Sequence, residues 1–128
     1  MNTGTVIDER GKDMPLIKVQ ASVDIPEDKK KALLSDLSRM TAKTIGKPEQ
    51  YVMAIVEHSA VWLGGKDAPA VFAEVRSIGG LNGSVNENIA RELCELLKAR
   101  LGISPDRVYI NFIDVPASAW GWNASTFG

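Results

Sequence analysis

Two strand–helix–strand units follow one another along this chain, and this repeat is the feature that most constrains its fold. In the first unit, residues 15–23 alternate apolar and polar side chains, which predicts a half-buried strand. A Pro-Glu-Asp sequence at residues 26–28 favours a helix start, because proline is tolerated in the first turn and acids interact favourably with the positive end of the helix dipole. A second strand is predicted over residues 51–57.

The first predicted helix carries apolar residues at spacings of three and four, which places them on one buried stripe. Gly46 suits the left-handed position that ends a helix, and Pro48 prevents the helix from resuming. The stripe consists of Leu33, Leu37, Met40, Thr41 and Ile45.

The second unit repeats this order, with strands predicted over residues 71–78 and 107–114. Between them, Ser84 and Glu87 match a capping box that opens a helix, and Gly102 is suited to end it. Two such units predict an α/β (α+β) domain with a mixed four-stranded sheet, two helices on one face and a pseudo-two-fold axis. The stripe of the second helix is Ile89, Leu93, Leu96, Leu97 and Leu101.

A sheet covered on one face leaves the other face open. On the last strand, Tyr109, Asn111 and Ile113 share the open face, which is too apolar for a solvated surface and too polar for a sealed core. We therefore expect a homo-oligomer. The tail "SAWGWNASTFG" could pack back on its own sheet or reach a neighbour, and the sequence leaves both open. The opposite set, Val108, Ile110 and Phe112, is expected to face the core.

Composition excludes several classes of function. A chain of 128 residues that is 45% hydrophobic fits one domain with a real core. A net charge of −1 gives no electrostatic case for binding nucleic acid, which usually needs a basic face, and no apolar run is long enough to span a membrane. Residues 1–13 lack the apolar core of a secretory signal. We expect a cytoplasmic protein, with export without a signal peptide left open.

Three single residues carry no site of their own. The single cysteine, Cys94, excludes an intrachain disulfide, and on an apolar helix stripe it is expected to be a small buried residue. The single histidine, His58, is expected to be exposed near a turn. We interpret Trp62, which precedes the Gly64-Gly65 turn, as a packing anchor.

Several segments together resemble the family of macrophage migration inhibitory factor and D-dopachrome tautomerase. They are "MPLIKV", "IGKPEQYV", "RSIGG", "LGISPDRVYINF" and "GWNASTF". The similarity is nearly collinear from Met14 to Gly128, and "SPDRVYINF" together with "GWNASTF" makes it specific. The resemblance implies the tautomerase fold, a homotrimer around a central channel, and keto–enol tautomerase activity on phenylpyruvate-like 2-keto acids. We interpret residues 15–128 as this domain and residues 1–14 as a disordered, removable or misassigned extension.

The resemblance also implies a set of site residues. In the family the initiator methionine is removed and the exposed proline is the catalytic base, which by position is Pro15. Lys47 matches the lysine that binds the substrate's carboxylate or keto oxygen. The remaining implied positions are Ser77 and Ile78 as backbone lining, Tyr109 and Asn111 from the adjacent subunit, and Tyr51, Trp120 and Phe127 as pocket walls.

The chemistry fits these residue types. Tautomerising a 2-keto acid requires removal of a proton next to a carbonyl, so the base must be neutral near pH 7. Burial among apolar walls and a nearby lysine cation both lower the pKa of an amine. The spacing of Tyr109 and Asn111 places both side chains on one strand face, where they can hydrogen-bond the substrate's oxygens. If any residue stays attached to Pro15, its nitrogen is an amide without basicity.

Structural roles remain open for the same residues. Pro15 can simply begin an edge strand, where a missing N–H costs little. Lys47 can interact with the carbonyls at the end of the preceding helix. Tyr109 and Asn111 can be interface residues without chemical duty. For the whole protein, the alternatives are a cytokine-like receptor-binding protein with vestigial or no catalysis, and a trimer that binds a small molecule.

The chain departs from the family pattern at some positions. Ala70 and Ala73 lie where some members carry a CxxC motif, so we expect no thiol oxidoreductase activity. Trp120 stands where a smaller apolar residue is usual, which should shrink the pocket or change its substrate preference. The loop "SIGGLNGS" fits neither GxGxxG nor the P-loop pattern. We expect neither a cofactor nor a metal ion.

Overall fold

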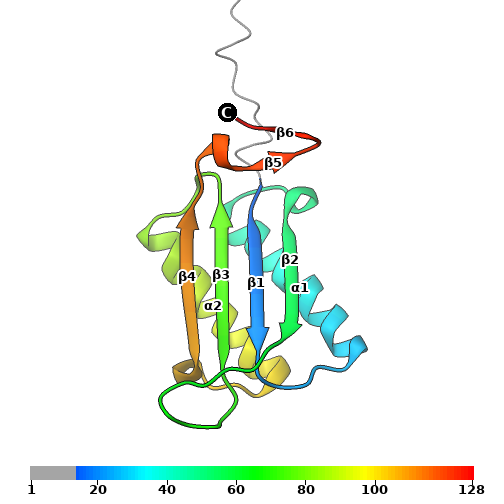
Figure 1. Cartoon of the computed structure of the whole chain (residues 1–128), viewed down its shortest axis with the longest axis vertical. Coiled ribbons are helices and arrows are strands. Elements are labelled where there is room, and N and C mark those ends of the chain that lie inside the picture. Colours follow the sequence, from blue (N-terminus) through cyan, green and yellow to red (C-terminus); the bar gives the residue numbers. More distant parts are fainter. Residues whose placement is uncertain (1–13) are drawn as a thin grey trace, which may run out of the picture.

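The computed structural model describes residues 14–128, which form a mixed four-stranded sheet covered by two helices (Figure 1). The sheet has the order β2-β1-β3-β4. Strand β1 runs parallel to β2 and antiparallel to β3, and β3 runs parallel to β4. The elements are β1 (Leu16–Ala21), α1 (Glu27–Ile45), β2 (Met53–His58), β3 (Val71–Ser77), α2 (Gly83–Leu101), β4 (Val108–Asp114), β5 (Gly121–Trp122) and β6 (Ser125–Thr126).

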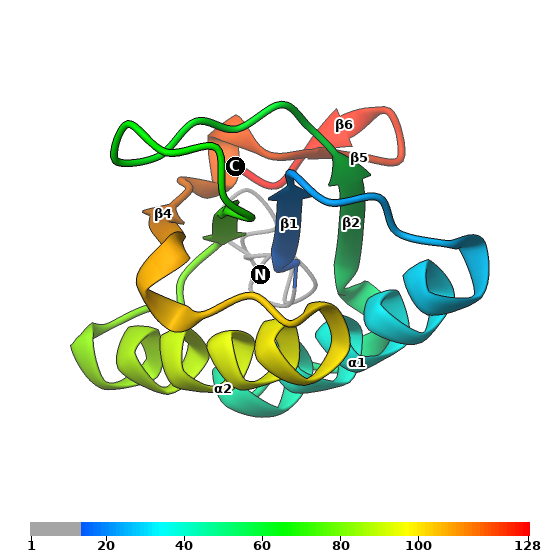
Figure 2. The same ribbon diagram turned by 90° about the horizontal axis from the view of Figure 1, so that it is seen from below.

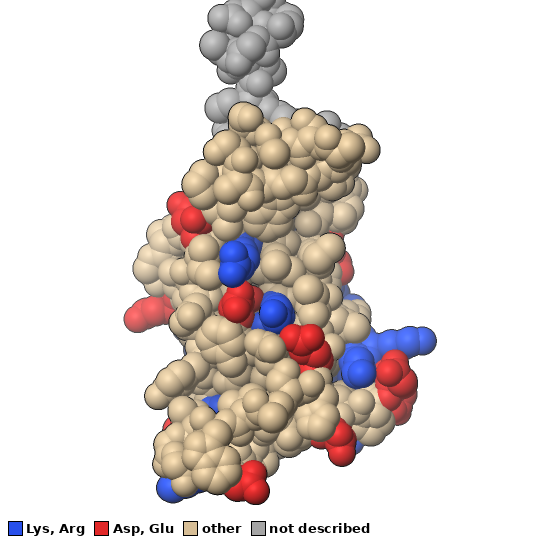
Figure 3. Space-filling model, viewed as in Figure 1, with Lys and Arg blue, Asp and Glu red and all other residues tan. Residues whose placement is uncertain are grey.

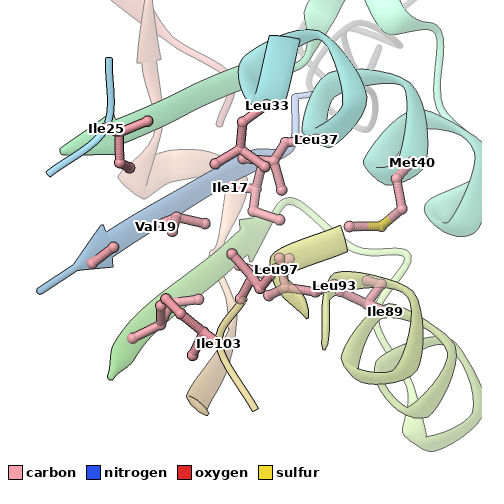
Figure 4. Packing of buried hydrophobic residues seen from close by; sticks show 14 residues of the cluster. Ile17, Val19, Ile25, Leu33, Leu37, Met40, Ile89, Leu93, Leu97 and Ile103 are labelled. Carbon is pink, nitrogen blue, oxygen red and sulfur yellow. The ribbon is translucent and has the colours of Figure 1, made fainter. Parts of the chain in front are cut away.

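Both helices lie on the same face of the sheet, as predicted, and the core is the layer between them (Figure 2). The alternation of β1 buries Ile17 and Val19 under the helices. The stripes of the helices meet these strand residues through Leu33 and Leu37 of α1 and through residues of α2 (Figure 4). The buried residues that α2 contributes are Ile89, Leu93 and Leu97, whereas Leu96 and Leu101 are only partly buried.

Both helices end as the sequence predicts, and the second begins differently. Gly46 and Gly102 end α1 and α2 with φ values of 79° and 68°, in the left-handed region. The predicted capping box of Ser84 and Glu87 is wrong. The side chain of Asn82 caps α2 instead, because its oxygen accepts a hydrogen bond of 2.9 Å from the backbone N–H of Val85.

The loop between β2 and β3 lies on the side of the sheet away from the helices (Figure 2). The Arg107 guanidinium fixes it by donating hydrogen bonds to backbone carbonyl oxygens of the loop. Trp62, in the same loop, is 69% exposed, so the expectation that it anchors packing is wrong for a single chain. The accepting carbonyls belong to Leu63, Lys66, Ala68 and Pro69, at 2.8 to 3.4 Å.

The uncovered face of the sheet carries basic and acidic side chains among uncharged ones (Figure 3). Lys18 pairs with Glu57 at 3.8 Å, and Arg76 pairs with Glu74 at 3.1 Å. Tyr109 on β4 leaves 62% of its surface exposed there. Its neighbours Val108, Ile110 and Phe112 pack against the core, so the predicted division of this strand between two faces is confirmed.

The structure bears out the expectation for His58 but not the one for Cys94. Cys94 is half-buried and not a core residue, because it lies beside the stripe of α2 rather than on it. His58 is exposed as expected, and its Nδ1 lies 3.2 Å from an Asp24 carboxylate oxygen. No helix within residues 14–128 has the length and apolar character needed to cross a membrane. The expectations for residues 1–13 lie outside the described residues.

Candidate active site

A cavity of about 530 Å³ opens at the end of the sheet where β1 begins. Pro15 lies in its wall, immediately before the first residue of β1, and is buried. The carbonyl oxygen of Pro15 accepts a hydrogen bond of 3.0 Å from the backbone N–H of Met53, at the start of β2. The full lining is Met14, Pro15, Leu16, Gln50, Tyr51, Val52, Met53, Trp120, Gly121 and Trp122.

Aromatic residues from two distant segments wall this cavity. Tyr51 ends a short 3-10 helix, Glu49–Tyr51, which follows Pro48. Trp120 follows a second one, Ala117–Ala119, and leads into the β5–β6 hairpin. The sequence-based expectation that Tyr51 and Trp120 lie with Pro15 thus agrees with the geometry of the cavity.

Phe127 does not line the cavity but supports its wall from behind. Its ring stacks on that of Trp122, with ring centroids 6.0 Å apart and planes at 10°. Its backbone N–H donates to the carbonyl oxygens of Ala117 and Trp120 at 3.2 and 3.3 Å. The hairpin therefore folds back on its own chain and presents Trp122 to the cavity.

Ser77 and Ile78 are buried next to the cavity and do not line it. Leu16 pairs with Arg76, so the antiparallel register carried one residue further sets Pro15 opposite Ser77. The Ser77 hydroxyl donates a hydrogen bond of 2.6 Å to the carbonyl oxygen of Gly79. The N–H of Gly79 in turn donates to Asp114 Oδ1 at 2.9 Å. These bonds fix the loop that follows β3.

Lys47 follows the cap of α1 and lies at the same end of the sheet, four positions before Tyr51. Its backbone N–H donates to the carbonyl oxygen of Ala42 at 2.9 Å, which completes the helix end. Its half-buried side chain lies over the backbone of Gly80, in the loop after β3. In a single chain it does not line the cavity.

Tyr109 and Asn111 are not brought together with Pro15 within one chain. They lie on the uncovered face of β4, in register with Phe72 and Glu74 of β3. Both are exposed and neither lines the cavity. A site that combines them with Pro15 therefore requires a second copy of the chain.

The segment that carries this fold and cavity matches a known protein family. A model of the family described as macrophage migration inhibitory factor matches residues 14–128, which span the sheet, both helices and the cavity. The chain belongs to the macrophage migration inhibitory factor family.

Individual members of the macrophage migration inhibitory factor family are similar to most of this chain. The macrophage migration inhibitory factor of Mus musculus is 40% identical over 118 residues, covering 89% of this chain and 99% of that protein. The crystal structure of the homologue from Prochlorococcus marinus has 44% identity and a TM-score of 0.84, covering 88% and 99%. The macrophage migration inhibitory factor-like protein of Entamoeba histolytica has 33% identity and a TM-score of 0.86, covering 89% and 99%. The chain therefore has the tautomerase fold of this family.

The cavity of this family member also has lining residues that sequence reasoning missed. Gln50 and Val52 flank Tyr51 in the sequence and Met53 comes next, and this proximity was the available signal for them. Trp122 carried a weaker signal, because its place in the wall depends on the hairpin. None of the ten lining residues is charged, so the described wall consists of apolar, aromatic and uncharged polar groups.

Proposed function

We propose that this chain, when Pro15 is its first residue, is a keto–enol tautomerase for phenylpyruvate-like 2-keto acids. The secondary amine of Pro15 is the general base in this proposal. The observation that carries it is the burial of Pro15 in the wall of an uncharged, aromatic cavity of about 530 Å³. Membership of the macrophage migration inhibitory factor family supports the same assignment.

The environment suits an amine that must be neutral to act. A prolyl amine in water is protonated near pH 7, since even an ordinary α-amino group has a pKa of about 8. Removal of water by Leu16, Tyr51 and Trp120 disfavours the charged form and lowers the pKa of such an amine. The neutral amine then takes the proton from the carbon next to the keto group. A proton is returned to the keto oxygen, which gives the enol, and the amine is neutral again.

The substrate has an aromatic end and an anionic end, and the proposal assigns residues to both. The aromatic ring packs between Tyr51, Trp120 and Trp122. Lys47, from the same end of the sheet, attracts the carboxylate. Its positive charge also favours the neutral form of the Pro15 amine.

We further propose that three copies assemble and complete each site. Tyr109 and Asn111 of a neighbouring copy would reach the substrate's oxygens. The uncovered sheet face supports assembly, because it carries exposed apolar groups such as Tyr109 and Met53, at 62% and 60% exposure, beside its ion pairs. Trp62, on the loop at the other end of the sheet, is a further exposed contact for a neighbour.

The test is an assay of phenylpyruvate tautomerisation with three proteins. The first begins at Pro15, as verified by intact mass. The second begins at the same position with Pro15→Gly, which keeps an amine but replaces the secondary one. The third is the full 128-residue chain, whose Pro15 nitrogen is an amide. Activity is expected only from the first, and a rate no higher than that of Pro15→Gly contradicts the catalytic proposal.

The same variants test whether any action of this chain on cells depends on catalysis. The relatives from Mus musculus and Rattus norvegicus are named for inhibition of macrophage migration, which is a property of those proteins. If the present chain acts on cells, the Pro15→Gly variant separates that action from catalysis. A receptor-binding role that persists in the catalytically silent variant is then independent of catalysis.

A further inference from the structure

Lys47 and Gly80 lie against one another although they belong to different strand–helix–strand units. A methyl group in place of a Gly80 hydrogen would stand 3.2 Å from Lys47 Cε and 3.8 Å from Lys47 Nζ. The same methyl group would stand 2.9 Å from Ile45 Cγ2. Carbon atoms in favourable contact are about 3.5–4.0 Å apart. The end of the lysine side chain therefore occupies space that is available only because residue 80 has no side chain.

The loop beneath Lys47 is held in place from its other side. The carbonyl oxygen of Gly79 accepts from the Ser77 hydroxyl at 2.6 Å, and the N–H of Gly79 donates to Asp114 Oδ1 at 2.9 Å. Ser77 itself is buried, and its carbonyl oxygen accepts from the N–H of Val115 at 2.9 Å. A side chain added at position 80 would thus displace the Ile45 side chain and the flexible lysine end more readily than the loop.

We propose that Gly80 is a positioning residue, which sets where the Lys47 ammonium stands relative to the cavity. The proposal rests on the function proposed above, because it takes Lys47 to hold the substrate's carboxylate. It deepens that function by assigning part of the preference for anionic substrates to a residue that touches no substrate. Hydrogen bonds between charged groups depend steeply on placement, so a shift of the ammonium by a few tenths of an ångström weakens the contact.

The chain supplies a matched control at the preceding position. Gly79 has a φ of +75° and Gly80 a φ of +83°, so alanine at either position adopts the same unfavourable left-handed backbone. A methyl group at Gly79, however, would meet nothing within 4 Å. The difference between Gly79→Ala and Gly80→Ala therefore reports the contact with Lys47 and Ile45, free of the backbone cost.

The experiment uses both alanine variants in the chain that begins at Pro15. KM and kcat are measured with phenylpyruvate and with its uncharged methyl ester, and the Kd of phenylpyruvate is measured by tryptophan fluorescence. We expect Gly80→Ala to raise KM and Kd for the acid about threefold to tenfold over Gly79→Ala. The two variants should have the same KM for the ester, which carries no carboxylate.

A second comparison removes the lysine. In a Lys47→Met background, Gly80→Ala should change the Kd of phenylpyruvate no more than Gly79→Ala does, because the displaced ammonium is absent. A purely structural effect of Gly80→Ala would persist in that background.

The outcomes distinguish this proposal from the proposed function. If the unmodified chain binds phenylpyruvate but does not turn it over, the catalytic proposal fails while the Kd ratio still decides the role of Gly80. Equal KM and Kd values for the two alanine variants overturn the role of Gly80 and leave the tautomerase intact. Absence of phenylpyruvate binding by the unmodified chain overturns both, since Lys47 then holds no carboxylate.

Discussion

Pro15 is tied to Met53 through its carbonyl oxygen, which accepts the Met53 N–H at 3.0 Å. The hydrogen bond places the proline without using its nitrogen. An amine at Pro15 would therefore be held in the cavity wall by the first rung of the β1–β2 ladder, with its lone pair available for proton transfer.

Met53→Pro removes this donor and is expected to loosen Pro15. Val52 already has φ and ψ values of −83° and 126°, which suit a residue before proline. The free energy of unfolding should fall by about 1 kcal/mol through the lost hydrogen bond. The kcat with phenylpyruvate should fall as well, because Pro15 is held less firmly in the cavity wall. Met53→Ala keeps the N–H and is the control. Urea unfolding checks that both variants are folded under the assay conditions. Equal kcat values for the two folded variants would show that the hydrogen bond does not place the base.

Trp120→Val is expected to enlarge the cavity. Trp120 is half-buried and lines it, so a smaller side chain frees room beside Tyr51 and Trp122. The ratio of kcat/KM for a bulkier aromatic 2-keto acid, such as one with an indole ring, to that for phenylpyruvate should rise about tenfold, the lower end of what one methylene group is worth in an apolar pocket. Phe127→Leu perturbs the same hairpin from behind and is the control. An unchanged ratio in Trp120→Val would remove Trp120 from the determinants of substrate size.

Mixed oligomers test whether sites are shared between copies. Pro15→Gly lacks the proposed base, and Asn111→Ala lacks the proposed contribution to a neighbour. When equal amounts are unfolded and refolded together, about a quarter of the sites should combine an intact Pro15 with an intact Asn111, if each site uses one residue from each of two adjacent copies in a closed ring. The activity of the mixture should then exceed the mean activity of the two variants. A mixture no more active than the mean of its parts would mean that Asn111 acts within its own chain or not at all.

Arg107→Ala should destabilise the domain without touching the cavity. The guanidinium serves four backbone carbonyls of the loop between β2 and β3. Its loss should lower the free energy of unfolding by about 1–3 kcal/mol, because hydrogen bonds from a charged group to the loop carbonyls are lost. Arg107→Lys should recover only part, since one ammonium cannot reproduce the planar fork. Urea unfolding of the three proteins checks this, and a change within about 0.5 kcal/mol for alanine would contradict the role.

Cys94 should resist alkylation in the folded chain. Desolvation by burial raises the pKa of its thiol above the usual value, so the thiolate that reacts is scarcer than in a free cysteine at the same pH. The folded form binds the proton more tightly than the unfolded form, so the contribution of Cys94 to stability is present below the unfolded pKa and is lost as the pH rises towards the folded one. Iodoacetamide kinetics at pH 8 in native buffer and in urea measure the difference, with Cys94→Ser as the blank. Equal rates would show that the thiol is not desolvated.

The fold was predictable because the apolar residues recur at the spacing of a strand in β1 and at the spacing of a helix in α1 and α2. The period-two alternation of β1 and the stripes of both helices identify the layers, and Gly46 and Gly102 mark the helix ends by their backbone requirement. The start of α2 was not predictable in the same way. Asn82 and Ser84 are both good caps, and the choice depends on the extended backbone at Asn82, with φ −154° and ψ 176°, which no local pattern specifies.

The site was predictable only in part, for physical reasons. Tyr51 and Trp120 reach the cavity as the family resemblance implies, but Trp122 depends on a hairpin whose two turn residues, Asn123 and Ala124, both have positive φ. Alanine there is not a usual turn signal. The expectation for Trp62 is wrong because it is exposed on a loop that is held by Arg107, which lies in a different strand–helix–strand unit. Contacts between distant segments are the information that local sequence lacks.

The burial of Met14 and Pro15 has a consequence for the order of events in synthesis. Both residues line the same cavity as Trp120 and Trp122, which are synthesised long after Pro15. In a folded chain that still carries Met14, a protease that frees Pro15 would have to draw Met14 out of this wall. Before Trp120 and Trp122 have been synthesised the wall is incomplete, so the same cleavage meets less hindrance. Cleavage before folding is complete would then decide which molecules carry a basic nitrogen.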